Sequence, residues 1–228
     1  MRMWCEFEKT ATVRHLGLLD LQRTMQRALR RSALPVAYSN GFNPHMLMSF
    51  ASALSSGIPG DAEIMDVRLS APVDPQEALC ALRKVLPPSL PVRRIRLVED
   101  SFPKAASLMK AARYELRLDS PDAPLIARAV EVFCRCDVVE ALKKSKSREE
   151  RVNIRPLVRS LTIEHLEDGQ LTLQTVVSFS ESASLRPDLL CRTLLELSGA
   201  ETQRVRIFRR ELLTQKDGHL VPLFEVVP

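Results

Sequence analysis

Strand-like and helix-like patterns of apolar residues follow one another in a fixed order, and this order limits the fold more than any other feature of the chain. In the first hundred residues, alternating apolar side chains indicate strands, and apolar side chains spaced by three or four indicate helices. The expected strands cover residues 2–8, 46–50, 63–69 and 91–98, and the expected helices cover residues 18–34 and 72–86. The resulting order, β-α-β-β-α-β, is typical of a ferredoxin-like domain.

The second half of the chain repeats this order loosely. Strands are expected at residues 114–118, 138–142, 160–166, 171–179 and 204–212, and helices at residues 124–133 and 187–198. A segment that contains proline, serine and lysine, residues 101–110, separates the two halves. We therefore predict an α+β protein of tandem ferredoxin-like domains, with an N-terminal domain at residues 1–100, a linker at residues 101–112 and a C-terminal domain at residues 113–228.

Three short signals predict where individual elements begin and end. Asp74 stands at an expected helix N-cap, where its carboxylate can accept hydrogen bonds from free backbone N–H groups. Gly199 follows the last expected helix, where a C-cap in the left-handed conformation favours glycine. The sequence Glu167-Asp168-Gly169 predicts the tight turn of a hairpin.

The composition favours a globular protein and tilts mildly toward anionic partners. Hydrophobic residues make up 45% of the 228 residues, which is enough for a buried core. The 33 lysines and arginines exceed the 28 acidic residues, which gives a formal net charge of +5. Five irregularly spaced cysteines do not make a disulfide framework, and no apolar stretch approaches the ~18 residues of a membrane span. We therefore expect a soluble cytoplasmic protein with no membrane partner.

A stripe of arginines is predicted on one face of the first helix. At about 100° per residue, the stripe consists of Arg23, Arg27, Arg30 and Arg31. The opposite, apolar face consists of Leu18, Leu21, Met25, Ala28 and Leu29. Guanidinium groups suit phosphates because they donate two parallel hydrogen bonds, so we predict that this arginine stripe binds RNA. The alternative is that acidic side chains of neighbouring strands pair with it.

The segment that follows this helix combines turn signals with aromatic and polar side chains. Its predicted RNA-binding residues are Tyr38, Asn40, Phe42, Asn43 and His45. The dipeptides Asn40-Gly41 and Asn43-Pro44 are typical of turns, so the backbone is expected to form a defined loop. The aromatic rings could stack on bases, as in proteins that bind single strands. The competing interpretation places Phe42 in the core and makes His45 a turn cap.

The second half carries a basic stretch that is expected to contact phosphates without sequence preference. Its predicted RNA-binding residues are Lys143, Lys144, Lys146 and Arg155. The serines between the lysines suggest a loop, and binding through it should weaken steeply with salt. A solvated loop with no ligand is the alternative.

Recognisable catalytic patterns are scarce. None of the four histidines stands in a metal-binding doublet, and Cys134-Arg135-Cys136 is one residue short of the C-x-x-C spacing. No phosphate-binding glycine loop or nucleophile-elbow motif occurs in the sequence. We therefore predict no metal and no cofactor, assign no catalytic residue, and lean against an enzyme.

Several of these segments occur together in a known family. Residues 14–23 (RHLGLLDLQR), 27–31 (RALRR) and 38–45 (YSNGFNPH) resemble the radical-SAM-linked family of uncharacterised bacterial proteins, a domain of unknown function. Members of that family stand alone or are fused behind a radical SAM domain. This chain lacks a C-x-x-x-C-x-x-C motif for a cluster, so the resemblance implies an accessory module that works with a radical SAM partner enzyme.

Three functional hypotheses follow. The first is a non-catalytic module that binds RNA, either tRNA or rRNA, and presents it to the radical SAM partner; ferredoxin-like sheets often serve RNA recognition. The second is a metal-independent endoribonuclease of the tandem ferredoxin-like type, with His15 as a general acid or base. The third is a protein-interaction scaffold in which the arginine stripe meets an acidic partner surface.

Overall fold

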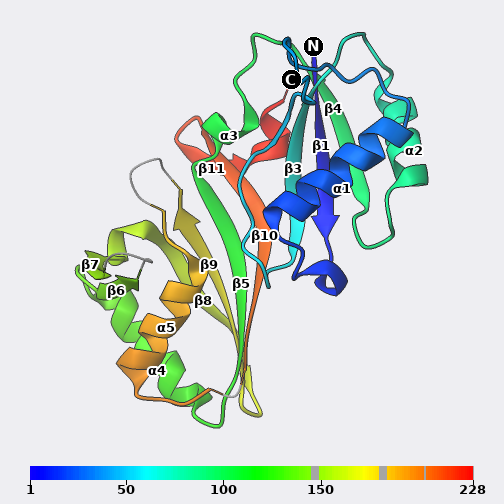
Figure 1. Cartoon of the computed structure of the whole chain (residues 1–228). Coiled ribbons are helices and arrows are strands. Elements are labelled where there is room, and N and C mark those ends of the chain that lie inside the picture. Colours follow the sequence, from blue (N-terminus) through cyan, green and yellow to red (C-terminus); the bar gives the residue numbers. More distant parts are fainter. Residues whose placement is uncertain (145–148, 180–183, 203, 228) are drawn as a thin grey trace. The chain divides into compact units, whose positions relative to one another are not determined.

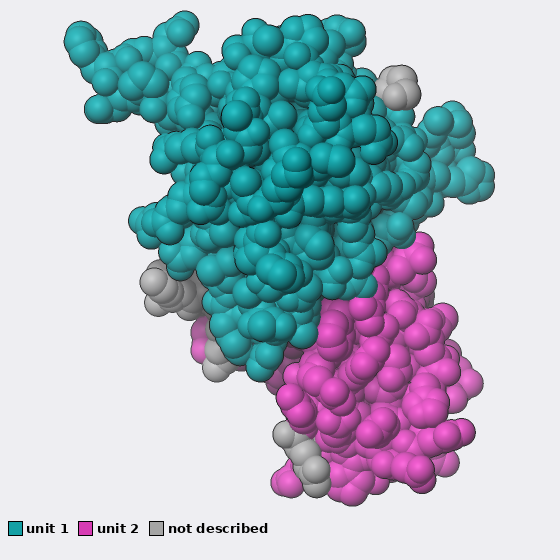
Figure 2. All heavy atoms as spheres, turned by 90° about the vertical axis from the view of Figure 1, so that its right-hand side faces the viewer, with its two compact units in different colours: residues 1–109, 211–228 teal, residues 110–210 magenta. Residues whose placement is uncertain are grey.

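The computed structural model describes residues 1–144, 149–179, 184–202 and 204–227. These residues form a mixed α+β structure with five α-helices and mostly antiparallel strand pairs, which confirms the predicted α+β class. Two compact units are present (Figure 2): residues 1–109 with 211–228, and residues 110–210. Within the described residues, no helix is long and apolar enough to cross a membrane.

The first unit contains most of the elements expected in the N-terminal half (Figure 1). In chain order they are β1 (Arg2–Lys9), η1 (Ala11–Val13), α1 (Leu18–Arg31), β2 (Met48–Phe50), β3 (Gly60–Arg68), α2 (Pro75–Val85), β4 (Val92–Val98) and α3 (Ala105–Leu108). The C-terminal part of β10 (Arg204–Lys216), β11 (His219–Pro222) and η3 (Leu223–Val226) complete it. The strand order is β4-β1-β3-β10, with β2 beside β3 and β11 beside β10.

One face of this sheet packs against α1 and α2. Met3, Cys5 and Phe7 alternate along β1 and are fully buried in that core. The buried residues of α1 are Leu21, Met25, Ala28 and Leu29, which confirms four of the five positions predicted for its apolar face. Leu18, the first residue of the helix, is instead 38% exposed, because helix packing begins one turn later. The predicted N-cap is also confirmed: the Asp74 carboxylate accepts from the backbone N–H groups of Gln76 at 2.8 Å and Glu77 at 2.9 Å.

The C-terminal segment packs against residues on the other face of the same sheet. Arg94 and Arg96 of β4 lie over the ring of Phe224, with guanidinium carbons 4.7 and 5.4 Å from its centroid. Arg96 also donates to the carbonyl oxygen of Val227 at 2.8 Å and to the carboxylate of Glu225 at 2.9 Å. Phe224 is only 1% exposed, so the chain end is part of the core of the first unit.

The second unit begins with β5 (Ala111–Asp119) and α4 (Ala123–Arg135). It continues with β6 (Glu140–Lys144), β7 (Glu149–Asn153), η2 (Arg155–Leu157), β8 (Val158–Glu167), β9 (Gln170–Ser178) and α5 (Pro187–Ser198), and ends within β10. Its strand order is β10-β5-β9-β8, and β6 pairs with β7 separately. The predicted turn and cap are confirmed: Asp168 and Gly169 have positive φ angles of 49° and 74° between β8 and β9, and Gly199 caps α5 with φ 64°.

The units divide the chain differently from the expected domains. Residues 211–228 belong to the first unit. Strand β10 continues past residue 210, and the apolar side chains that follow, such as Phe224, are buried in the core of that unit. The expected linker, residues 101–112, is also packed: it contains α3 with its buried Ala105 and the start of β5. Local patterns located the break near residue 110 but not the return of the chain.

Phe224→Ala should therefore destabilise the first unit by about 3–5 kcal/mol, since it leaves a cavity in a closed core. The single tryptophan, Trp4, reports on this unit because its buried ring meets Phe102 edge-on at 5.7 Å. Urea unfolding followed by Trp4 fluorescence measures the change. The matched control is Phe42→Ala, the same substitution at a side chain that is 106% exposed, which should shift stability by less than about 0.5 kcal/mol. Equal effects of the two substitutions would contradict the packing described for the chain end.

Candidate nucleic-acid interface

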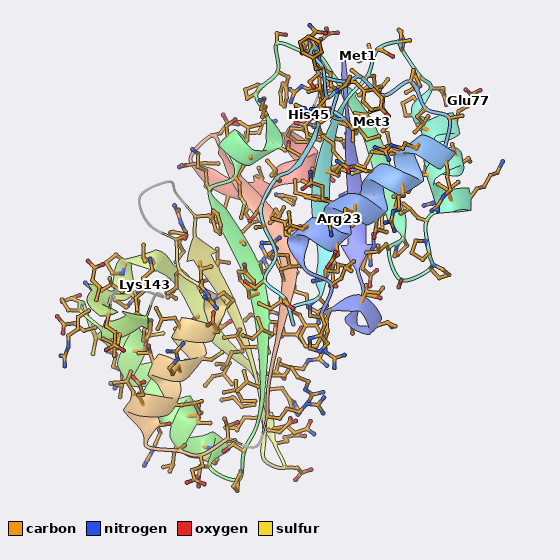
Figure 3. All side chains as sticks on the ribbon, in the orientation of Figure 1. Met1, Met3, Arg23, His45, Glu77 and Lys143 are labelled. Atoms are coloured by element: carbon orange, nitrogen blue, oxygen red, sulfur yellow. The ribbon has the colours of Figure 1, made fainter. Side chains whose placement is uncertain are left out.

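The arginine stripe is exposed along the solvent face of α1, as Figure 3 shows for Arg23. Arg23 makes an exposed ion pair with Asp20 of the same helix at 3.3 Å, and Arg31 donates to the carbonyl oxygen of Val85 at 2.9 Å. The guanidinium groups of Arg27 and Arg30 have no hydrogen bond or ion pair within the described residues. Acidic side chains of neighbouring strands therefore do not neutralise this pair within the part of the chain that is described.

The stripe is stable without a ligand. Arginines four apart repel one another by a few tenths of a kcal/mol. Arg30 and Arg31 lie in the last turn of α1, where the helix dipole stabilises each positive charge by about 0.3–1 kcal/mol. The two effects are similar in size and opposite in sign. The arginines are therefore held on a folded helix by its buried apolar face and remain available to an anion.

The segment after α1 forms a closed loop. Tyr38 and Met46 form an isolated β-bridge, and the Ser39 N–H donates to the His45 carbonyl oxygen at 2.8 Å. The Ser39 hydroxyl accepts from the His45 N–H at 3.0 Å and lies 2.8 Å from ring atom Nδ1 of His45. These contacts explain why the turn dipeptides give one defined loop, and they occupy only one nitrogen of the His45 ring.

The loop presents its side chains to solvent. Phe42 is 106% exposed and Tyr38 is 43% exposed, and Asn40, Asn43 and His45 are exposed as well. The interpretation that places Phe42 in the core is therefore wrong, whereas the turn-capping role of His45 fits the contacts with Ser39. A phenylalanine that buries nothing contributes little to folding, so its ring is free to stack on a flat partner.

The basic stretch of the second unit is divided between two environments. Lys143 is exposed in β6, opposite Glu150 of β7, and Figure 3 labels it. Arg155 donates to the carbonyl oxygens of Val158 at 3.0 Å and Cys134 at 3.3 Å, and lies over the ring of Phe133. Its guanidinium therefore ties η2 to α4. The Lys144 side chain and the whole of Lys146 lie outside the described residues.

A buried ion pair in the first unit was not anticipated from the sequence. Arg2 Nη1 lies 2.6 Å from Asp66 Oδ2, and both side chains are almost fully buried. Burial raises the pKa of Asp66 above its ordinary value, and the charge of Arg2 opposes that shift. A signal was present, because the charged residues Arg2, Glu6, Glu63 and Asp66 stand between apolar residues of the two strands.

The cysteines and histidines do not gather. Within the described residues, no three or more histidine, cysteine or acidic side chains are placed to hold a metal ion. Burial raises the pKa of the Cys5 thiol, and raises that of Cys191 to about 12, so neither is a nucleophile at neutral pH. His15, on which the endoribonuclease hypothesis depends, is exposed after η1 and contributes its carbonyl oxygen to a hydrogen bond from Ser56.

Comparison with known families decides the identification. Residues 2–187 match the family model described as uncharacterised protein conserved in bacteria, DUF2344. The chain belongs to the DUF2344 family. This confirms the prediction of a bacterial family of unknown function, and both the arginine stripe and the loop of residues 38–45 lie inside the range that matches DUF2344. A comparison with the curated proteins gives no match.

Arg2→Met should lower the free energy of unfolding by about 3–5 kcal/mol at neutral pH, because it leaves the Asp66 carboxylate buried without its partner. Loss of Arg2 raises the pKa of Asp66 further, so the folded state takes up a proton more readily than the unfolded chain does. The difference in free energy of unfolding between the wild-type chain and the variant should therefore shrink as the pH falls through the raised pKa of Asp66. Urea unfolding at several pH values, again followed by Trp4 fluorescence, measures it.

Arg23→Met provides the control, since it removes an exposed ion pair that is worth less than about 1 kcal/mol. A deficit for Arg2→Met that stays constant from neutral to acid pH would show that lost packing, and not the uncompensated charge, causes it.

Proposed function

We propose that this DUF2344 chain is an RNA-binding module that presents tRNA or rRNA to a radical SAM partner enzyme. The observation that carries the proposal is the free, exposed pair Arg27 and Arg30 on α1. RNA supplies phosphates for these guanidinium groups. The loop of the same unit adds the exposed ring of Phe42, on which an unpaired base can stack.

Single-stranded regions of a folded RNA fit this combination better than a duplex does. A duplex buries the faces of its bases, whereas loops and bulges expose them to aromatic side chains. The nearby Asn40 and Asn43 side chains are exposed and can bond to base edges through their amide groups. The part of the proposal that names a radical SAM partner rests on the family resemblance alone.

We also propose that both units are ferredoxin-like, a fold that often serves RNA recognition. The strand orders support this: β4-β1-β3 with β2 beside β3 in the first unit, and β10-β5-β9-β8 in the second. In each unit the helices come after the first and third of these strands in the sequence, as β-α-β-β-α-β requires, and the β6–β7 pair is an insertion.

Binding of labelled bulk tRNA, followed by fluorescence anisotropy between about 50 and 200 mM salt, tests the RNA-binding step. The double variant R27A/R30A should weaken binding and make the negative slope of log K against log salt shallower by about 1.4, the value for two single-strand phosphate contacts. Phe42→Ala should cost about 1–3 kcal/mol of affinity with the slope unchanged, because stacking releases no counterions.

The matched control is R128A/R135A, which removes two exposed arginines from another amphipathic helix, α4. An equal loss for the two double variants would mean that tRNA responds only to net charge. Unchanged affinity in both R27A/R30A and F42A would overturn the proposed interface and favour the scaffold hypothesis.

A further inference from the structure

A polar pocket of about 290 Å³ lies in the first unit, next to the closed loop. One side is formed by His45 and residues 46–49, which lead into β2, and another by Asp66 and Arg68 of β3. Arg2, Asp100 and Lys104 complete the lining. Figure 3 shows His45 near the start of β1, so the loop and the pocket share this residue.

The inner part of the pocket is rigid and carries a hydrogen-bond acceptor. Arg2 is fixed by Asp66 at 2.6 Å and by the carbonyl oxygens of Phe102 and, at 3.2 Å, Pro103. Asp66 Oδ2 also accepts from the Ala105 N–H at 3.3 Å. The Trp4 side chain interacts with this carboxylate as well, and because a carboxylate has about four acceptor positions, Asp66 keeps acceptor capacity. A ligand that donates a hydrogen bond would therefore meet an acceptor that is already oriented.

The outer part of the pocket carries two cationic side chains, Lys104 and Arg68, and the carboxylate of Asp100, which also pairs with the N-terminal ammonium group at 2.8 Å. The ammonium group of Lys104 has no hydrogen bond or ion pair within the described residues. Arg68 uses one guanidinium nitrogen for Asp100 at 3.2 Å and keeps its other donors. The His45 ring uses Nδ1 for Ser39, so Nε2 is its free nitrogen. All three side chains line the same pocket, so an anionic group that enters it would meet these donors.

The pocket has a hydrogen-bond acceptor, Asp66, in its inner part and the cationic side chains of Lys104 and Arg68 in its outer part. This arrangement selects a ligand with a hydrogen-bond donor at one end and an anionic group at the other. Met46 and Met48 add an apolar lining, and methionine sulfur packs well against aromatic rings. A flat base with an exocyclic amino group, joined to a phosphate, meets all three conditions. Uracil fits less well because its one ring N–H stands between two carbonyl oxygens, which would face the Asp66 carboxylate.

We propose that this pocket binds one nucleotide, with the amino group of adenine, guanine or cytosine donating to Asp66 and the phosphate contacting Lys104, Arg68 and His45. The proposal deepens the proposed function, because the nucleotide can be one residue of the bound RNA. A free mononucleotide carries the same chemistry, so the pocket can be probed without RNA.

Calorimetric titration of the nuclease-treated full chain tests this with AMP, GMP, CMP and UMP, and with guanosine and inorganic phosphate. The three amino-bearing nucleotides should bind, UMP at least tenfold more weakly, and guanosine and inorganic phosphate more weakly than GMP. Equal binding of UMP, or of phosphate alone, would overturn the proposal, since the pocket would then respond only to the anion.

Two variants locate the binding without touching the buried ion pair. Lys104→Ala should weaken the binding of GMP at least fivefold and leave the binding of guanosine unchanged. Lys84 is an exposed lysine of α2 outside the pocket, so Lys84→Ala should change neither affinity. Ser49 is exposed and stands opposite Asp66 in the β2–β3 register, so Ser49→Leu should fill the pocket and abolish binding. Retained GMP binding in S49L would overturn the assignment.

The two proposals fail separately. Loss of tRNA binding in R27A/R30A with no mononucleotide binding would overturn the pocket alone. Nucleotide binding with the expected base preference, together with tRNA affinity that does not depend on α1 or Phe42, would overturn the proposed interface and leave the pocket standing.

Discussion

The buried ion pair between Arg2 and Asp66 is the constraint on which the first unit depends. It joins β1 and β3, which are neighbouring strands of one sheet. It also fixes the segment that leads into α3, because Arg2 donates to the carbonyl oxygens of Phe102 and Pro103 and Asp66 accepts from the N–H of Ala105. A buried pair of this kind gives little net stability compared with apolar residues, but loss of one partner is costly. The pair ties these segments together, and both of its residues line the pocket beside β2.

The opposite face of the same sheet determines what the unit shows to solvent. Leu21, Met25, Ala28 and Leu29 seat α1 in the core, and the helical period then places Arg27 and Arg30 on the far side. The loop after α1 is closed by hydrogen bonds between Ser39 and His45. These bonds fix the backbone around Phe42, whose own ring is exposed. Positive charge and an aromatic ring are thus displayed by one folded unit.

Local patterns were sufficient for the elements and insufficient for their partners. The amphipathic face of α1, the Asp74 cap and the Asp168–Gly169 turn each depend on residues within a few positions of one another, and each was predicted. Arg2 and Asp66 are 64 residues apart, and the chain end that holds Phe224 returns to β4 over a longer distance still, so no periodicity links them. The exposure of Phe42 could not be predicted from the sequence either, because an aromatic residue in a turn can lie in a core or on a surface.

The central claim is that RNA meets the first unit at the closed loop. Ultraviolet cross-linking of the full chain mixed with bulk tRNA, followed by mass spectrometry of the peptides, tests it most directly because it reports position without any substitution. We predict cross-links at Tyr38, Phe42 or His45, and none on α4. Cross-links confined to residues 140–153 of the second unit would contradict it.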